Sequence, residues 1–109
     1  MAQTIVNTTL TSNVTLIEIN TGNTAQLKVF LLPQASLHPG KFYFFKDLTG
    51  AASTNNVFIS TSANGDSIDR TGRQAFLNTS YGSIGLMSDG STTWKTIASY
   101  LGEYSQFLT

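Results

Sequence analysis

The sequence predicts a single all-β domain, folded as a sandwich or a barrel. Apolar residues come in about eight short bursts, rich in β-branched and aromatic side chains, whose starts are roughly 10 to 12 residues apart. Clusters of Gly, Asn, Asp, Ser and Thr separate the bursts, as turns do between strands. At 109 residues the chain has the length of one domain and no linker divides it, so residues 1–109 should share one core.

The bursts are the candidate strands, and most are followed by a residue that tolerates a positive φ. Asp89-Gly90 is the strongest hairpin signal, because this dipeptide suits a type I′ turn. Ile97, Leu101 and Tyr104 recur at helical spacing, so the last stretch is either a helix or a tail packed across the sheet. The predicted strands are residues 4–10, 14–20, 26–32, 41–47, 56–61, 74–78, 83–88 and 92–100.

Composition excludes several classes of function. Charged residues make up 11% of the chain, against a usual share of about 25%, and Ser, Thr and Asn fill 36 of the 109 positions instead. The formal net charge is zero, so no field draws the chain to nucleic acid or to an anionic membrane. There is no cysteine, and neither a signal peptide nor a membrane-spanning run is visible. We therefore expect no nucleic-acid partner, no membrane partner and no disulfide.

Two predicted strands, residues 27–32 and 41–48, carry large apolar side chains on both faces. In an antiparallel sheet one face usually meets water, so such strands indicate either a central position in a monomer or a contact between subunits. We expect self-association, with central core strands as the alternative. The candidate subunit-interface residues are Phe42, Tyr43, Phe44 and Phe45.

Groups that could carry out chemistry are sparse. His38 is the only histidine and lies in a His-Pro-Gly turn, with no nucleophile or orienting acid that the sequence identifies as its partner. Asp66 and Asp69, with Asn64, could hold Ca²⁺, but the ligand density of a calcium loop is missing and turn capping explains them better. We expect no catalytic residue, no cofactor and no metal, so the chain is not predicted to be an enzyme.

The segment after this acid pair is the best candidate for a contact with a ligand or a partner. Two arginines flank Gly72 and could form ion pairs with Asp66 or Asp69, or meet a carboxylate of a partner or an acidic glycan. The candidate contact residues are Asp69, Arg70, Arg73 and Tyr81.

A carbohydrate-binding, lectin-like module is the alternative function. Trp94, Tyr81 and Tyr100 could form an aromatic platform on which a sugar ring stacks. The same residues could instead fill a sandwich core, which often contains one Trp beside several aromatic rings.

Half of the chain carries an ordered set of short motifs. A Lys-Asp-Leu-Thr-Gly segment at residues 46–50 leads to an Asn-Val-Phe-Ile strand, a Gly-Asp-Ser-Ile-Asp turn at 65–69, Tyr-Gly-Ser-Ile at 81–84, and Ser-Asp-Gly at 88–90 followed by a Trp. This order resembles a module of phage tail-fibre proteins and of structural proteins of other large DNA viruses. The sequence departs from that pattern at residues 70–73 and beyond residue 100. The resemblance implies that six residues form the framework of the module: Asp66, Ile68, Asp69, Asp89, Gly90 and Trp94.

The resemblance implies a β-rich, often trimeric domain of a virion appendage or capsid surface, with a role in assembly or host attachment. Together with the strand pattern it leads us to expect an antiparallel, jelly-roll-like β-sandwich of about eight strands that forms a homotrimer. The expected protein is a viral structural or fibre-head protein, made in the host cytoplasm and placed on the virion. Its expected partners are copies of itself, other virion proteins and, as an open alternative, a host glycan.

Overall fold

The computed structural model describes residues 4–11, 14–22, 26–69 and 72–100, and within them the chain is all-β, with nine strands and one short 3₁₀ helix. Seven of the eight predicted strands match an observed strand at both ends to within one residue, and residues 14–20 enclose the eighth, so the strand prediction is confirmed. The elements are β1 (Thr4–Thr9), β2 (Leu16–Ile19), β3 (Gln26–Leu32), η1 (Ala35–Leu37), β4 (Phe42–Asp47), β5 (Val57–Thr61), β6 (Ser67–Ile68), β7 (Gln74–Leu77), β8 (Ser83–Ser88) and β9 (Thr93–Tyr100).

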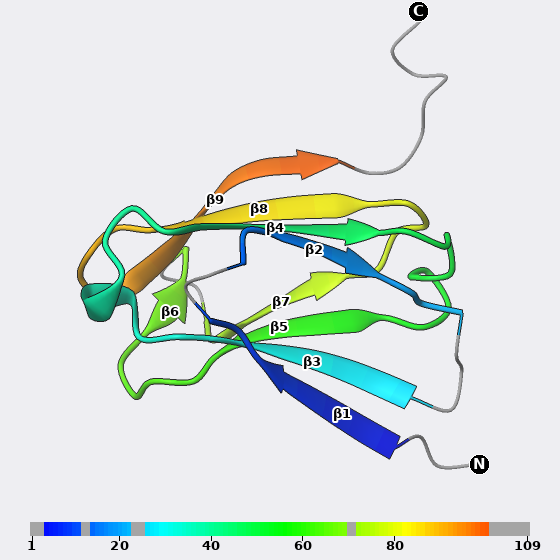
Figure 1. The fold of residues 1–109 in the computed structure, drawn as a ribbon, viewed down its shortest axis with the longest axis horizontal. Helices are drawn as coiled ribbons and strands as arrows, with labels where there is room; N and C mark the ends of the chain where they lie inside the picture. The colour runs from blue at the N-terminus through cyan, green and yellow to red at the C-terminus, as the bar shows by residue number, and fades with distance from the viewer. Residues whose placement is uncertain (1–3, 12–13, 23–25, 70–71, 101–109) are drawn as a thin grey trace, which may run out of the picture.

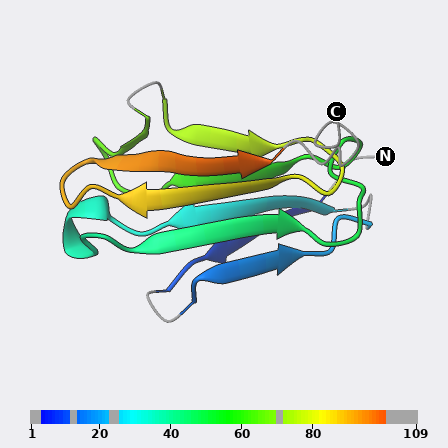
Figure 2. The same cartoon turned by 90° about the horizontal axis from the view of Figure 1, so that it is seen from above.

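The strands form two stacked sheets, as Figures 1 and 2 show. Sheet A has the order β1-β3-β5-β7, and sheet B has the order β2-β4-β8-β9-β6. The sandwich prediction is therefore confirmed at the level of two packed layers.

The predicted antiparallel, jelly-roll-like topology is wrong, because both sheets are mixed. From β1 to β5 the chain alternates between the sheets, and each strand runs parallel to the one before it in the same sheet. Thr4 pairs with Gln26, 22 residues further on, and Leu16 pairs with Phe44, 28 residues further on. The first half of the chain thus winds around the sandwich like a β-solenoid, passing from one sheet to the other at each turn. Strands β7, β8 and β9 then complete the two sheets with antiparallel pairs.

Local sequence does not distinguish these two topologies. A Gly-rich turn after a strand can return the chain to the same sheet as a hairpin or take it across to the opposite sheet. The turns of this solenoid-like half differ in length, so no sequence repeat marks them either. The positions of the strands could therefore be predicted from the local sequence, but the pairing of the strands could not.

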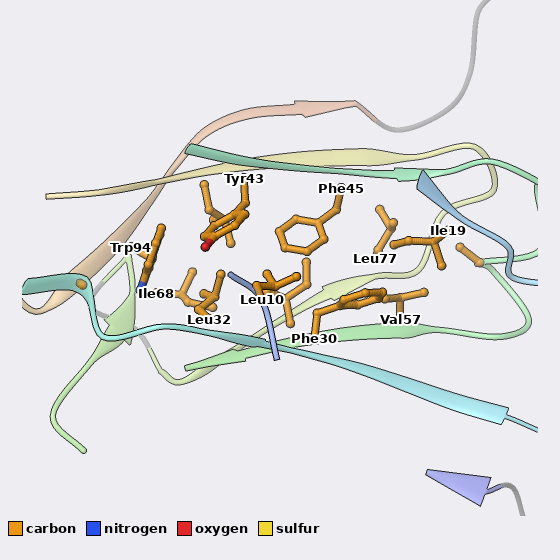
Figure 3. Packing of buried hydrophobic residues seen from close by; sticks show 14 residues of the cluster. Leu10, Ile19, Phe30, Leu32, Tyr43, Phe45, Val57, Ile68, Leu77 and Trp94 are labelled. Atoms are coloured by element: carbon orange, nitrogen blue, oxygen red, sulfur yellow. The ribbon is translucent and has the colours of Figure 1, made fainter. Parts of the chain in front are cut away.

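The core lies between the sheets (Figure 3), and alternate residues of the central strands form most of it, joined by residues of the edge strands and connections. From sheet B, Tyr43 and Phe45 point inward and are 0% exposed. Phe30 of sheet A meets Phe45 edge to face, with ring centroids 5.7 Å apart. Each large side chain buried in this way stabilises the fold by roughly 1.5 to 3 kcal/mol. The buried hydrophobic residues are Leu10, Ile19, Phe30, Leu32, Ala35, Tyr43, Phe45, Ala52, Val57, Ile59, Ile68, Leu77, Leu86 and Trp94.

The hairpin predicted at Asp89-Gly90 is present, since β8 and β9 pair antiparallel. The predicted type I′ turn is wrong, because that turn needs a positive φ at both central residues and only Gly90 has one, at 79°. The loop is longer instead, and the Asp89 carboxylate closes it by accepting the N–H groups of Ser91 at 2.8 Å and Thr93 at 3.1 Å.

Two further differences concern short or terminal elements. The two-residue strand β6 was not predicted, because Ser67–Ile68 is too short to carry a periodic pattern, yet it pairs in parallel with β9. Ile97, predicted to begin a helix or a tail, lies within β9. The rest of that prediction, from Leu101 onward, falls outside the described residues.

Candidate functional site

The four predicted contact residues do not form one cluster. Asp69 directly follows β6 and Arg73 directly precedes β7, so both lie at one end of the sandwich. Tyr81 lies in the connection between β7 and β8, at the opposite end (Figure 1). Arg70 lies outside the described residues.

The polar groups of Asp69 and Arg73 hold neighbouring segments of the chain. Asp69, with a φ of 52°, accepts the backbone N–H of Thr96 at 2.8 Å. The guanidinium of Arg73 donates to the hydroxyl of Thr61 at 3.0 Å and to the carbonyls of Thr61 and Ala63 at 3.3 and 3.2 Å. Both residues therefore support the loop structure at this end, which is the role of a capping residue.

The strongest polar cluster of the fold surrounds Asp47, which the sequence had not singled out as a site. Asp47 ends β4 and is 0% exposed. One carboxylate oxygen accepts the hydroxyl of Thr21 at 2.6 Å and the N–H of Gly50 at 3.0 Å. The other accepts the N–H of Ala52 at 3.0 Å and the N–H of Tyr81 at 2.9 Å. One side chain thus joins three connections that lie far apart in the sequence.

Two opposing effects act on the pKa of Asp47. Burial raises the pKa, because it penalises the charged form, while the hydrogen bonds from Thr21, Tyr81, Ala52 and Gly50 lower it. The hydrogen bonds win, so the pKa lies below its usual value and the group is an ionised carboxylate at neutral pH. All of its acceptor capacity is directed at this chain, which is the arrangement of a structural anchor.

Tyr81 and Gly50 fit together at the rim of this cluster. Tyr81 has a φ of 60° and is 44% exposed, and its ring covers Gly50 so closely that a Cβ at Gly50 would overlap it. Gly50 itself has a φ of 87°, a conformation that side chains other than glycine rarely adopt.

We expect Gly50→Ala to destabilise the domain more than Gly65→Ala. Gly65 has the same φ of 87°, but no atom lies within 4 Å of the position that a Cβ would take there, so it is a matched control for backbone strain alone. The control should lose about 1 kcal/mol, and Gly50→Ala about 1 kcal/mol more, because the Tyr81 ring must move. Urea unfolding of both variants measures the difference, and equal losses would contradict the contact.

The four candidate interface residues of β4 divide between two environments. Tyr43 and Phe45 point into the core and are fully buried within one chain, which corrects the expectation that all four lie at a subunit contact. Phe42 and Phe44 point to the outer face of sheet B and are only half-buried. The alternation of a strand puts neighbours on opposite faces, so a run of four aromatics has to serve both.

The outer face of sheet B carries an apolar patch. Gly85 on β8 leaves room there, and a Cβ at this position would lie 2.9 Å from the ring of Phe42 and 3.3 Å from the ring of Phe44. The two rings therefore pack over Gly85, while their outer surfaces remain exposed. We call this patch the apolar face, and it consists of Leu16, Phe42, Phe44 and Met87.

A groove of about 320 Å³ opens beside this face, between the edge strands β1 and β2. Leu10, Val14 and Phe30 lie in its wall together with threonines, and Glu18 is the only ionisable side chain among the described residues that line it.

Trp94 does not belong to a surface platform. It is 0% exposed, donates its indole N–H to the carbonyl of Pro33 at 3.2 Å, and packs against Tyr43 with ring centroids 5.5 Å apart. The side chain of Tyr100 is outside the described set, so Tyr81 is the one proposed platform residue with an exposed ring in the structure.

Two other classes of site are missing from the described residue ranges. No group of three or more His, Cys, Asp or Glu side chains lies close enough there to hold a metal ion. No helix in those ranges is long and apolar enough to cross a membrane.

A scan against protein-family models found no match, and a search of curated proteins found no relative of this chain.

Proposed function

We propose that the chain is a non-enzymatic structural module that associates with copies of itself on the surface or in an appendage of a virion. The observation that carries the proposal is the apolar face of sheet B, which a single copy leaves open to water. The motif order from residues 46 to 94 supports the viral setting by its resemblance to tail-fibre and virion structural modules.

The polar groups of the chain support a structural role. Each of the four aspartates in the described ranges accepts backbone N–H groups of its own chain: Asp47, Asp66, Asp69 and Asp89. Carboxylates used in this way fix loops and do not activate a substrate. Host attachment and contacts with other virion proteins belong to the same proposal. The resemblance implies a trimer, but the apolar face by itself requires only self-association, and the mass of the native assembly gives the number of copies.

We expect the wild-type chain to be oligomeric at micromolar concentration and the double variant Leu16→Ser/Met87→Ser to be mostly monomeric. Leu16 is 55% and Met87 36% exposed, so neither change removes a core side chain, whereas both remove apolar area from the contact. Native mass spectrometry measures the outcome as multiples of 11.8 kDa.

Leu37→Ser is the control for this experiment. Leu37 is 69% exposed but belongs to η1, in the connection between β3 and β4 and not to the apolar face, so its variant should associate like the wild type. A monomeric wild-type chain would sink the proposed function, and equal effects of all these variants would show that general hydrophobicity alone drives association.

A further inference from the structure

The outer face of sheet B carries three charged side chains, Glu18, Lys46 and Lys95, and two of them, Glu18 and Lys95, lie at opposite corners of the apolar face. Glu18 lies on the edge strand β2, and Lys95 lies on β9 at the other side of the face. Both are exposed, and neither makes a salt bridge or a side-chain hydrogen bond with another residue of the described ranges. Glu18 is in register with Lys46, whose amino group is turned to the carbonyl of Tyr81.

The strand registers fix where the two charges lie. In one row across the sheet, Phe42 pairs with Met87, and Met87 pairs with Lys95. In the row that contains Glu18, the partner on β4 is Lys46, four residues beyond Phe42. Glu18 and Lys95 are therefore separated by three strand spacings of about 4.8 Å and by four residues of about 3.4 Å, so the line joining them crosses the face diagonally at about 45° to the strands.

We infer that this face binds the same face of a second copy around a two-fold axis, with Glu18 of each copy opposite Lys95 of the other. A two-fold axis in the plane of the contact, perpendicular to the Glu18–Lys95 diagonal, exchanges the two corners. The opposite charges then meet twice, and the same rotation lays Leu16 of one copy over the row of Phe42 and Met87 of the other.

The crossing angle supports this arrangement. Because the diagonal runs at about 45° to the strands, the rotation makes the strands of the two copies cross at about 90°, which is one of the two arrangements in which β-sheets pack face to face. The apolar residues lie in the middle and the charges at the rim, as in specific protein interfaces.

The outer face of sheet A lacks such a pattern. Phe58 and Phe76 form an edge-to-face pair there, with centroids 5.1 Å apart, beside Leu27, Val29 and Leu31. No charged side chain stands among the described residues of that face, so nothing orients a partner on it. Charge complementarity therefore selects sheet B and a second copy as the occupant.

This inference rests on the proposed self-association and specifies its geometry, and a reciprocal charge exchange tests it. Glu18→Lys and Lys95→Glu should each weaken self-association by roughly tenfold, because each replaces two attractions by two repulsions in the dimer. The double variant Glu18→Lys/Lys95→Glu should restore the wild-type dissociation constant, since the charges are complementary again. Sedimentation equilibrium at low salt gives the constants, and thermal unfolding should show that all three variants stay folded.

Gln74→Lys is the matched control, because it adds a positive charge at an exposed position of β7, outside the apolar face. It should leave the dissociation constant unchanged. Two results would refute the two-fold contact while self-association stands: single reversals that leave the dissociation constant of the wild type unchanged, or a double variant that associates no more tightly than the single variants. A trimeric mass that survives the reversals would also refute the two-fold contact. A monomeric wild type would contradict both proposals.

Discussion

Asp47→Ala should cost the domain about 3 kcal/mol or more of unfolding free energy, the largest loss that we expect from any polar substitution. The change removes the acceptor of four hydrogen bonds in a fully buried position. The hydroxyl of Thr21 and the N–H of Ala52 would then be buried without that partner, and the part-buried N–H groups of Gly50 and Tyr81 would lose it too. Each buried unsatisfied donor costs about 1 to 3 kcal/mol. Urea unfolding measured by fluorescence gives the difference.

Asp89→Ala is the control for this substitution. Asp89 also accepts two backbone N–H groups, but it is exposed, so water can replace the lost acceptor. Its loss should stay near 1 kcal/mol. Similar losses for Asp47→Ala and Asp89→Ala would show that the buried cluster has no special weight in the fold.

The stability that Asp47 supplies should depend on pH in the acid range. Its pKa in the folded chain is lower than in the unfolded chain, so the unfolded state binds more protons as the solution becomes acidic. The contribution is therefore fully present above a pH of about 4 and is lost as the pH falls through the folded-state pKa. The difference in unfolding free energy between the wild type and Asp47→Asn should therefore become smaller in acid. A difference that is constant from neutral pH to about pH 3 would contradict the assigned charge state.

The strands could be predicted because their signals are local. The burst from 26 to 32 and the burst from 83 to 88 match β3 and β8 at both ends, since a short run of apolar residues between turn-forming residues marks each of them within a few positions. The parallel pairing of β1, β3 and β5 could not be predicted, because it depends on where the chain goes after each turn.

The candidate site was harder to predict for the same reason. Asp47 is hydrogen-bonded to Thr21, 26 residues before it, and to Tyr81, 34 residues after it, so no local spacing reveals the cluster. The one available signal was the motif order itself, because the Lys-Asp-Leu-Thr-Gly and Tyr-Gly-Ser segments supply most of the cluster. Conversely, Arg73 and Tyr81 are near in sequence but are held apart by β7.

The second half of the motif serves the opposite end of the sandwich. Asp66 accepts the N–H of Ala35 at 2.9 Å, the hydroxyl of Ser88 donates to the carbonyl of Ala35 at 2.7 Å, and Trp94 donates to Pro33. Three motif residues thus fix the connection between β3 and β4, which leads into the aromatic strand. The motif residues therefore hold the connections at both ends of the sandwich, and β4, which lies between these ends, contributes Phe42 and Phe44 to the apolar face of sheet B.

Trp94→Ala should lower the free energy of unfolding by about 3 to 5 kcal/mol, because it empties the space beside Tyr43 and Ile68 and leaves a cavity in the core. For a domain of this size, that loss moves the thermal midpoint down by roughly 12 °C or more. Trp94→Phe should recover most of the loss, since it restores a ring and gives up the N–H bond to Pro33. Differential scanning calorimetry measures both variants. A Trp94→Ala protein that melts within a few degrees of the wild type but has lost affinity for a glycan would contradict the core role of Trp94. Such a result would favour the lectin-like alternative over the structural module.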